Sequence, residues 1–170
     1  MDKVKVLIDE ETINKRLDEM ARQIEKDYEG KEILMVCVLK GACFFAVNLA
    51  QRIKNNIYFE FIELSSYENS TKSSGAIILN KDIKTSIDSK DVIVVEDIID
   101  TGRTLKYLIE HFKKRNPNSI KLCTLLDKPS RRTVDVKVDY LGFQIPDHFV
   151  VGCGLDYAQK YRNLPYIGCI

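Results

Sequence analysis

Hydrophobic positions near the start of the chain follow the spacing of a helix. Between residues 13 and 28, apolar side chains three and four positions apart mark one helical face: Ile13, Leu17, Met20, Ala21, Ile24 and Tyr28. We expect Thr12 to cap the beginning of this helix and Gly30 to end it in a left-handed turn. The run at 33–39 is apolar throughout, which is typical of a parallel strand covered on both faces.

Strand-like and helix-like segments alternate along the rest of the chain. We expect a helix over 42–54, followed by strands over 57–64, 76–80, 92–95 and 119–126. Before the last of these strands, a third helix has an apolar face made of Leu105, Leu108, Ile109 and Phe112. This alternation predicts an α/β fold, a mainly parallel twisted sheet flanked by helices. The ligand site of such a sheet lies beyond the carboxyl ends of its strands.

The composition is typical of a soluble globular protein. The 170 residues fit a single domain, 1–170, without a repeat or linker that would divide it. Apolar, strand-like runs recur along the whole chain and exclude a disordered protein. A net charge of +1 gives no overall attraction to nucleic acid, although it leaves a local basic patch open. No apolar stretch has the length of a membrane helix, and the N-terminus is too charged for a secretory signal. We therefore expect a cytoplasmic protein with neither a membrane nor a nucleic-acid partner.

The cysteines and histidines indicate neither a metal centre nor covalent chemistry. The five cysteines have no CxxC spacing, and four lie among apolar residues, where a reduced cysteine behaves as a small hydrophobe. None has the surroundings of a catalytic nucleophile, and neither His111 nor His148 needs a catalytic role. The sequence thus predicts no disulfide framework and no zinc site.

The segment at 94–104, Val-Val-Glu-Asp-Ile-Ile-Asp-Thr-Gly-Arg-Thr, carries the clearest chemical signal. Its small turn opens a helix, where backbone N–H groups and the helix dipole favour a phosphate. Glu96 and Asp97 repel phosphate, but they are suited to accept hydrogen bonds from sugar hydroxyls or to lie near a metal ion. Together these groups predict a site for a phosphorylated sugar with Mg²⁺. The alternative is that the acids only cap a helix and keep a strand edge soluble.

This segment resembles the phosphoribosyl-pyrophosphate signature of the type I phosphoribosyltransferases. The Ile98-Ile99 pair and later features make the chain similar to hypoxanthine-guanine phosphoribosyltransferases of the short bacterial form, over nearly its whole length. The resemblance implies the type I fold with a small C-terminal hood region. The base-binding elements of this hood are implied to come from the N-terminal segment and from roughly 128–170. It also implies Mg²⁺-dependent transfer of the 5-phosphoribosyl group from phosphoribosyl pyrophosphate to a 6-oxopurine. Hypoxanthine would give IMP and guanine GMP, and pyrophosphate would be released.

The resemblance assigns roles within the motif. It makes Asp100 the general base or hydrogen-bond acceptor at N7 of the purine. Glu96 and Asp97 are implied to hold the ribose hydroxyls and Mg²⁺, while Asp156 reaches a second Mg²⁺ partly through water. The 5′-phosphate is implied to lie against the turn residues Thr101, Gly102, Arg103 and Thr104.

Further residues are assigned outside the turn. The implied pyrophosphate contacts are Lys40 and Gly41, in a loop that often has a cis peptide bond in the family, and Arg162. Ser66 and Tyr67, in the polar segment 65–75, are implied to belong to a mobile lid that excludes water from the reacting sugar. The implied purine contacts are Ile98, Lys128, Phe149 and Val150, with Lys128 donating to the 6-oxo group.

The residues alone also admit simpler interpretations. Lys40 suits a solvated lysine before a helix, Lys128 and Arg162 suit surface charges, and Phe149 suits the core. The segment 65–75 suits an ordinary hairpin loop.

A second class of function stays open at this point: a nucleotide-sensing regulator that keeps the fold but binds RNA or protein. Such a regulator should show a basic face, whereas Lys128, Phe149 and Asp156 together favour the enzyme. The family is usually dimeric or tetrameric, so the resemblance implies a homodimer or homotetramer.

Overall fold

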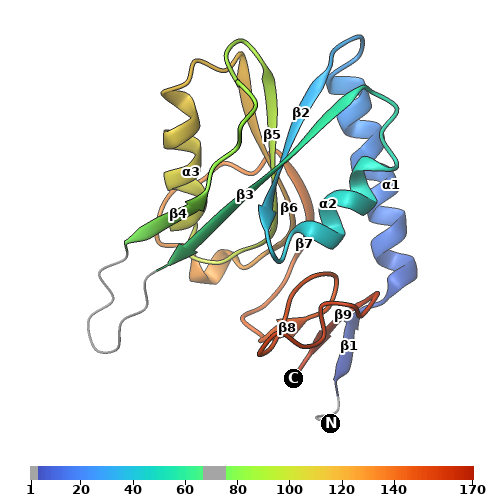
Figure 1. Ribbon diagram of the computed structural model, residues 1–170. Coiled ribbons are helices and arrows are strands. Elements are labelled where there is room, and N and C mark those ends of the chain that lie inside the picture. Colours follow the sequence, from blue (N-terminus) through green and yellow to red (C-terminus); the bar gives the residue numbers. More distant parts are fainter. Residues whose placement is uncertain (1–3, 67–75) are drawn as a thin grey trace.

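The structure, a computed structural model, describes residues 4–66 and 76–170. Its main body is a six-stranded sheet of order β4-β3-β2-β5-β6-β7, in which only β4 runs antiparallel to its neighbour (Figure 1). The strands are β2 (Ile33–Leu39), β3 (Ile57–Ser66), β4 (Ile77–Lys81), β5 (Asp91–Ile99), β6 (Ser119–Asp127) and β7 (Tyr140–Gln144). The predicted α/β fold with a mainly parallel sheet is confirmed.

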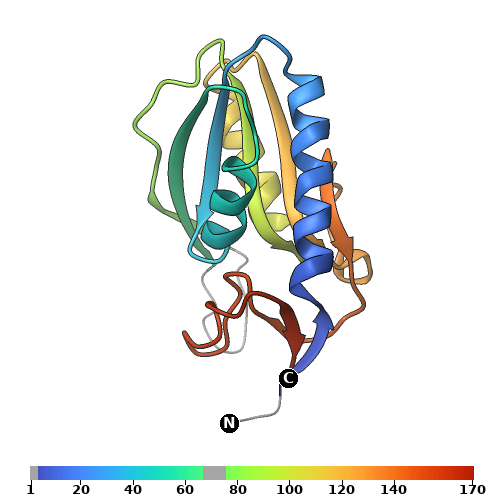
Figure 2. The same ribbon diagram turned by 90° about the vertical axis from the view of Figure 1, so that its right-hand side faces the viewer.

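Helices cover both faces of this sheet, as Figure 2 shows. They are α1 (Glu10–Asp27), α2 (Cys43–Ala50) and α3 (Arg103–Lys113), with a 3₁₀ turn, η1 (Pro129–Arg131), after β6. Successive side chains of a strand point to opposite faces, so β2 contributes to two cores. Met35 and Cys37 pack with residues of α1 and α2, whereas Leu34 and Val36 pack with residues of α3.

A second, antiparallel sheet of three short strands joins the two ends of the chain. Its order is β1-β9-β8, from β1 (Lys5–Ile8), β9 (Ile167–Cys169) and β8 (Val150–Val151). Figure 1 shows it beyond the carboxyl end of β2, where the rule for parallel sheets places a ligand. Since β7 belongs to the main sheet, residues 128–170 are divided between the two sheets.

Some predicted boundaries are wrong. The cap of α1 is Asp9, not Thr12: the Thr12 N–H donates to Asp9 Oδ1 at 2.8 Å. The second helix ends at Ala50, four residues before its predicted end at 54. The strand predicted over 92–95 extends to Ile99 because β6 pairs with it that far. Gly30 has the predicted left-handed conformation, with φ +71°.

Within the two described ranges, no helix has both the length and the apolarity to span a membrane.

Candidate active site

The motif forms a strand, a turn and a helix around a small cavity. β5 ends at Ile99, and α3 begins after Gly102, whose φ of +86° lies in the left-handed region that favours glycine. The cavity has a volume of about 150 Å³, and its lining includes every motif residue from Glu96 to Thr104 except Arg103. The N–H groups of the first turn of α3 lie beside these residues, an arrangement suited to an anion; the Arg103 N–H also donates to Thr101 Oγ1 at 3.4 Å.

Glu96 and Asp97 are neighbouring acids near the end of β5, the first buried and the second partly buried. Glu96 is only 8% exposed, and its Oε1 accepts the Asp97 N–H at 3.0 Å. Asp97 Oδ1 accepts the Ile98 N–H at 2.7 Å. Burial raises the pKa of both carboxyls, and the charge of Asp97 raises the pKa of Glu96 further. Hydrogen bonds from Glu96 and from the Ile98 N–H, and to a smaller extent the charge of Arg162, partly offset the effect of burial on the pKa of Asp97. The pair therefore lies where additional positive charge would be stabilising.

This donor set fits Mg²⁺ that is shared with a diphosphate. Among the residues described, no three of the types His, Cys, Asp and Glu gather as a metal cage. Mg²⁺ typically binds one or two protein carboxylates and completes its shell with phosphate oxygens and water. Glu96 and Asp97, neighbours on the lining of the cavity, supply two such carboxylates. One oxygen of Asp156 lies 3.0 Å from an Arg162 nitrogen, and its other oxygen accepts the Gln159 N–H at 2.7 Å.

The loop after β2 packs directly on this acid pair. The Leu39–Lys40 peptide bond is cis, as the family resemblance implies. A Cβ atom added to Gly41 would lie 1.7 Å from Asp97 Oδ2, and one added to Gly154 would lie 2.0 Å from the Gly41 carbonyl oxygen. Arg162 Nη1 donates to the Gly154 carbonyl at 2.6 Å. The structure thus brings Gly41 and Arg162, two predicted pyrophosphate contacts, to neighbouring places beside Asp97, whereas the Lys40 side chain is exposed.

The predicted purine contacts come from β5, the end of β6 and the small sheet. Lys128 is not a surface lysine: its side chain is 11% exposed, and its Nζ lies 3.4 Å from Asp147 Oδ1. Phe149 is not a core residue: it is 55% exposed and meets the Tyr157 ring edge-on, with centroids 5.6 Å apart. Val150 is buried in β8, and Ile98 is partly exposed at the cavity.

Ser66 and Tyr67 are the two residues that the resemblance assigns to a lid. Ser66 is the exposed last residue of β3, paired with Ile77 of β4. Tyr67 and the rest of the polar segment through residue 75 lie outside the described residues.

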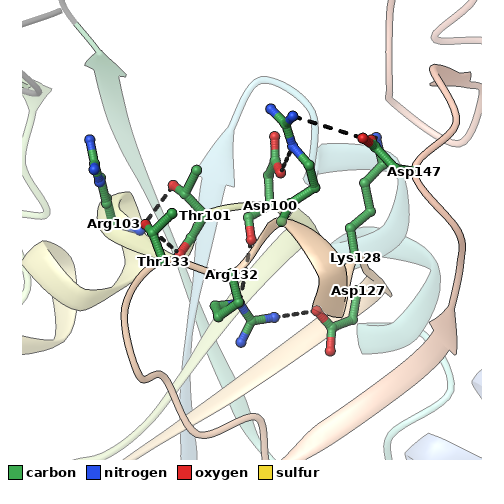
Figure 3. A network of polar contacts seen from close by, with 9 residues as sticks. Asp100, Thr101, Arg103, Asp127, Lys128, Arg132, Thr133 and Asp147 are labelled. Carbon is green, nitrogen blue, oxygen red and sulfur yellow. Dashed lines mark hydrogen bonds and ion pairs between the residues drawn. The ribbon is translucent and has the colours of Figure 1, made fainter.

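Sequence reasoning missed the contacts that η1 makes with the turn. Arg131 Nε donates to Asp100 Oδ1 at 3.0 Å, and its Nη1 lies 3.8 Å from Asp147 Oδ2 (Figure 3). Arg132 pairs with Asp127 and donates to the Asp100 carbonyl at 3.3 Å; the Thr133 N–H donates to the Thr101 carbonyl at 3.1 Å. The one available signal was three positive charges within 128–132, at the end of a buried strand.

All five cysteines are free. Burial raises the pKa of Cys37 to about 12, and it raises the pKa of Cys123 as well. These two thiols are therefore protonated at neutral pH and poor nucleophiles.

A phosphate-binding turn beside two acids, at the carboxyl edge of a parallel sheet, defines a class of nucleotide-processing site. Comparison with known proteins agrees: the family described as "Phosphoribosyl transferase domain" matches residues 5–158. The chain belongs to this phosphoribosyltransferase family.

Comparison with individual proteins shows which members of the phosphoribosyltransferase family the chain resembles. The chain is 49% identical over 166 residues to the hypoxanthine-guanine phosphoribosyltransferase of Bacillus subtilis, covering 98% of this chain and 92% of that protein. A crystal structure of a hypoxanthine-guanine phosphoribosyltransferase from Bacillus anthracis superposes with a TM-score of 0.94 at 51% identity, covering 99% of both chains. The chain also matches the bifunctional protein TilS/HprT of Listeria monocytogenes at 49% identity, but it spans only 26% of that protein. The predicted resemblance to hypoxanthine-guanine phosphoribosyltransferases and the predicted fold are confirmed.

Proposed function

We propose that this protein transfers a 5-phosphoribosyl group from phosphoribosyl pyrophosphate to hypoxanthine and guanine, forming IMP and GMP and releasing pyrophosphate, a purine-salvage reaction. The observation that carries the proposal is the shared edge on which the phosphate turn, the acid pair and Lys128 lie. The similarity to hypoxanthine-guanine phosphoribosyltransferases supports it. The alternative of an RNA- or protein-binding regulator gains no support from these relatives.

The sugar phosphate is held by the turn and the acid pair. The N–H groups and hydroxyls of Thr101, Gly102, Arg103 and Thr104 bind the 5′-phosphate at the start of α3. Glu96 and Asp97 accept hydrogen bonds from the ribose hydroxyls and provide carboxylates for Mg²⁺, while Asp156 reaches a second Mg²⁺ partly through water. When bound, Mg²⁺ supplies positive charge that favours departure of the diphosphate.

Bond breaking at C1′ builds oxocarbenium character on the sugar, so the protein acts chiefly by positioning and charge. Lys40, Gly41 and Arg162 hold the departing pyrophosphate. Asp100 accepts the proton at N7 of the purine, and Lys128 donates to its 6-oxo group. A buried donor at that point disfavours adenine, whose 6-amino group is itself a donor. Ile98, Phe149 and Val150 bind the ring, and Ser66 and Tyr67 belong to a lid over the reacting sugar.

We further propose one domain, 1–170, with hood elements from the N-terminal segment and roughly 128–170, acting in the cytoplasm as a homodimer or homotetramer. Helix α2 supports assembly, because it leaves Phe44 45% and Val47 40% exposed. Light scattering after size-exclusion chromatography measures the mass directly. A monomer at micromolar concentration would contradict this part of the proposal.

The reaction is tested by measuring pyrophosphate release from phosphoribosyl pyrophosphate and Mg²⁺ with five bases supplied separately. We expect turnover with hypoxanthine and guanine, and little with adenine or uracil. The rate with xanthine shows how well the site accepts an oxo group at the purine 2-position. Omission of Mg²⁺ should abolish turnover. Nucleotide binding without turnover on any base would refute the proposal and favour a regulator.

A further inference from the structure

The carboxylate of Asp100 is fixed through one of its own two oxygens. Arg131, at the end of η1, donates from Nε to Asp100 Oδ1 at 3.0 Å. In the portion of the chain that the structure describes, Asp100 Oδ2 accepts no hydrogen bond from another residue. A carboxylate fixed by one oxygen presents the other in a defined direction, which suits an N–H donor on a ligand.

The same guanidinium connects Asp100 to Lys128. Arg131 Nη1 lies 3.8 Å from Asp147 Oδ2, and Asp147 Oδ1 lies 3.4 Å from Lys128 Nζ. Charges therefore alternate along a chain of four side chains, Asp100, Arg131, Asp147 and Lys128, whose formal charges cancel (Figure 3). The two ends of this chain are the groups proposed to contact N7 and the 6-oxo group of the purine. The two middle members have no assigned role.

We propose that Arg131 and Asp147 are positioning residues of the purine site. Arg131 orients Asp100 toward N7, and Asp147 links that guanidinium to Lys128, so that the acceptor and the donor keep the separation of N7 and O6. The inference rests on the roles proposed above for Asp100 and Lys128.

Stability alone does not account for this arrangement. Arg131 and Asp147 are 50% and 51% exposed, and ion pairs this exposed typically contribute little to folding stability. Orientation is worth more in a reacting complex than in folding, because small misplacements of a catalytic group lower the rate steeply. The expected consequence is therefore kinetic rather than structural.

The test compares R131Q, R131K, D147N, D100N and the double variant D100N/R131Q in steady-state assays with hypoxanthine. R131Q should lower kcat at least about tenfold, with an unchanged KM for phosphoribosyl pyrophosphate and an unchanged melting temperature. R131K, which keeps the charge, should recover part of this loss. D147N should raise KM for hypoxanthine about fivefold with little change in kcat. If Arg131 acts through Asp100, the double variant should be no slower than D100N.

The matched control is R52Q. Arg52 is also a partly exposed arginine paired with an acid, with Nε 2.8 Å from Asp18 Oδ1, but it links α1 to the end of α2 away from the site. R52Q should retain wild-type kinetics.

Three outcomes would overturn the inference: wild-type kinetics in R131Q, losses in R131Q and D100N that multiply in the double variant, or a loss in R131Q without one in D100N. The proposed function fails differently, through a wild-type protein that turns over no 6-oxopurine, and that result would overturn both.

Discussion

At the scale of single residues, the site depends on two glycines whose backbone lies very close to neighbouring groups. Gly41 lies against the Asp97 carboxylate and Gly154 lies against Gly41, so the loop after β2, the acid pair and the segment near Arg162 share one small volume. Neither contact leaves room for a methyl group. The glycines at 41 and 154 are thus required by packing, independently of any ligand.

G41A should disable the site. The new methyl would meet Asp97 Oδ2 at 1.7 Å, so either the loop or the carboxylate must move. Since a displacement of about 1 Å commonly costs about 10²-fold in rate, we expect a loss of that order in kcat/KM for phosphoribosyl pyrophosphate. The control is G30A, at a position with φ +71° and no atom within 4 Å of the added methyl. G30A should lose about 1 kcal/mol of unfolding free energy and keep its kinetics. Equal kinetics in the two variants would contradict the argument.

D100N should lower the rate of the chemical step much more than it weakens nucleotide binding. The amide keeps the shape of Asp100 but cannot take a proton, so kcat should fall by about 10²–10⁴-fold. The affinity for IMP, measured by calorimetry, should change much less. Similar losses in turnover and affinity would argue against a proton-accepting role.

At the scale of elements, the end of α1 is tied to the edge of the main sheet. Tyr140 of β7 donates to Asp27 Oδ2 at 2.6 Å, and Lys121 of β6 lies 3.3 Å from the same oxygen. The hydrogen bond from Tyr140, aided by Lys121, lowers the pKa of Asp27 despite some burial. A carboxyl whose pKa is lowered by folding stabilises the fold above its unfolded pKa, about 3.9, and this contribution disappears as pH falls through the lower value.

Y140F should therefore destabilise the protein in a pH-dependent way. Loss of a hydrogen bond to a charged group should cost about 1–3 kcal/mol of unfolding free energy at pH 7. The difference from wild type should shrink below about pH 4, as Asp27 becomes protonated. Urea denaturation at several pH values measures both, with Y58F as the control, because the Tyr58 hydroxyl lies 3.5 Å from Glu32 and its side chain is half-exposed. A pH-independent difference would show that packing, not the ion, is responsible.

At the scale of the whole molecule, residues from both sheets surround the same edge. Phe149 and Val150 come from the small sheet and its approach, whereas Glu96 to Thr104 come from the main sheet and α3. A nucleotide that contacts both groups binds the folded protein and not the unfolded chain. Ligand binding should therefore be coupled to global stability.

IMP should raise the free energy of unfolding. At a concentration of 100 times Kd the increase should be about 2.7 kcal/mol, measured as a shift of the urea midpoint. AMP, which carries a 6-amino group, should stabilise the protein less at the same concentration. Equal stabilisation by both nucleotides would mean that Lys128 does not read the 6-position.

The sequence predicts the sheet, its helices and the phosphate turn because these depend on local patterns: the apolar run at 33–39, the helical face of α3 and the turn at 100–104. It does not reveal β1, whose four residues gain their structure only by pairing with β9 at the other end of the chain. Arg131 and Asp147 were missed for the same physical reason. The role proposed for Arg131 and Asp147 depends on their contacts with Asp100 and Lys128. The fold brings these four residues together, and no short-range sequence pattern links them.

The central claim is that this site builds nucleotides on 6-oxopurines. The most direct measurement is a competition in one vessel, with phosphoribosyl pyrophosphate, Mg²⁺ and equal concentrations of hypoxanthine and adenine, followed by quantification of IMP and AMP. Because the product ratio equals the ratio of the two kcat/KM values, we predict IMP in excess of AMP by at least about 10²-fold. Comparable amounts of the two nucleotides, or an excess of AMP, would contradict the account.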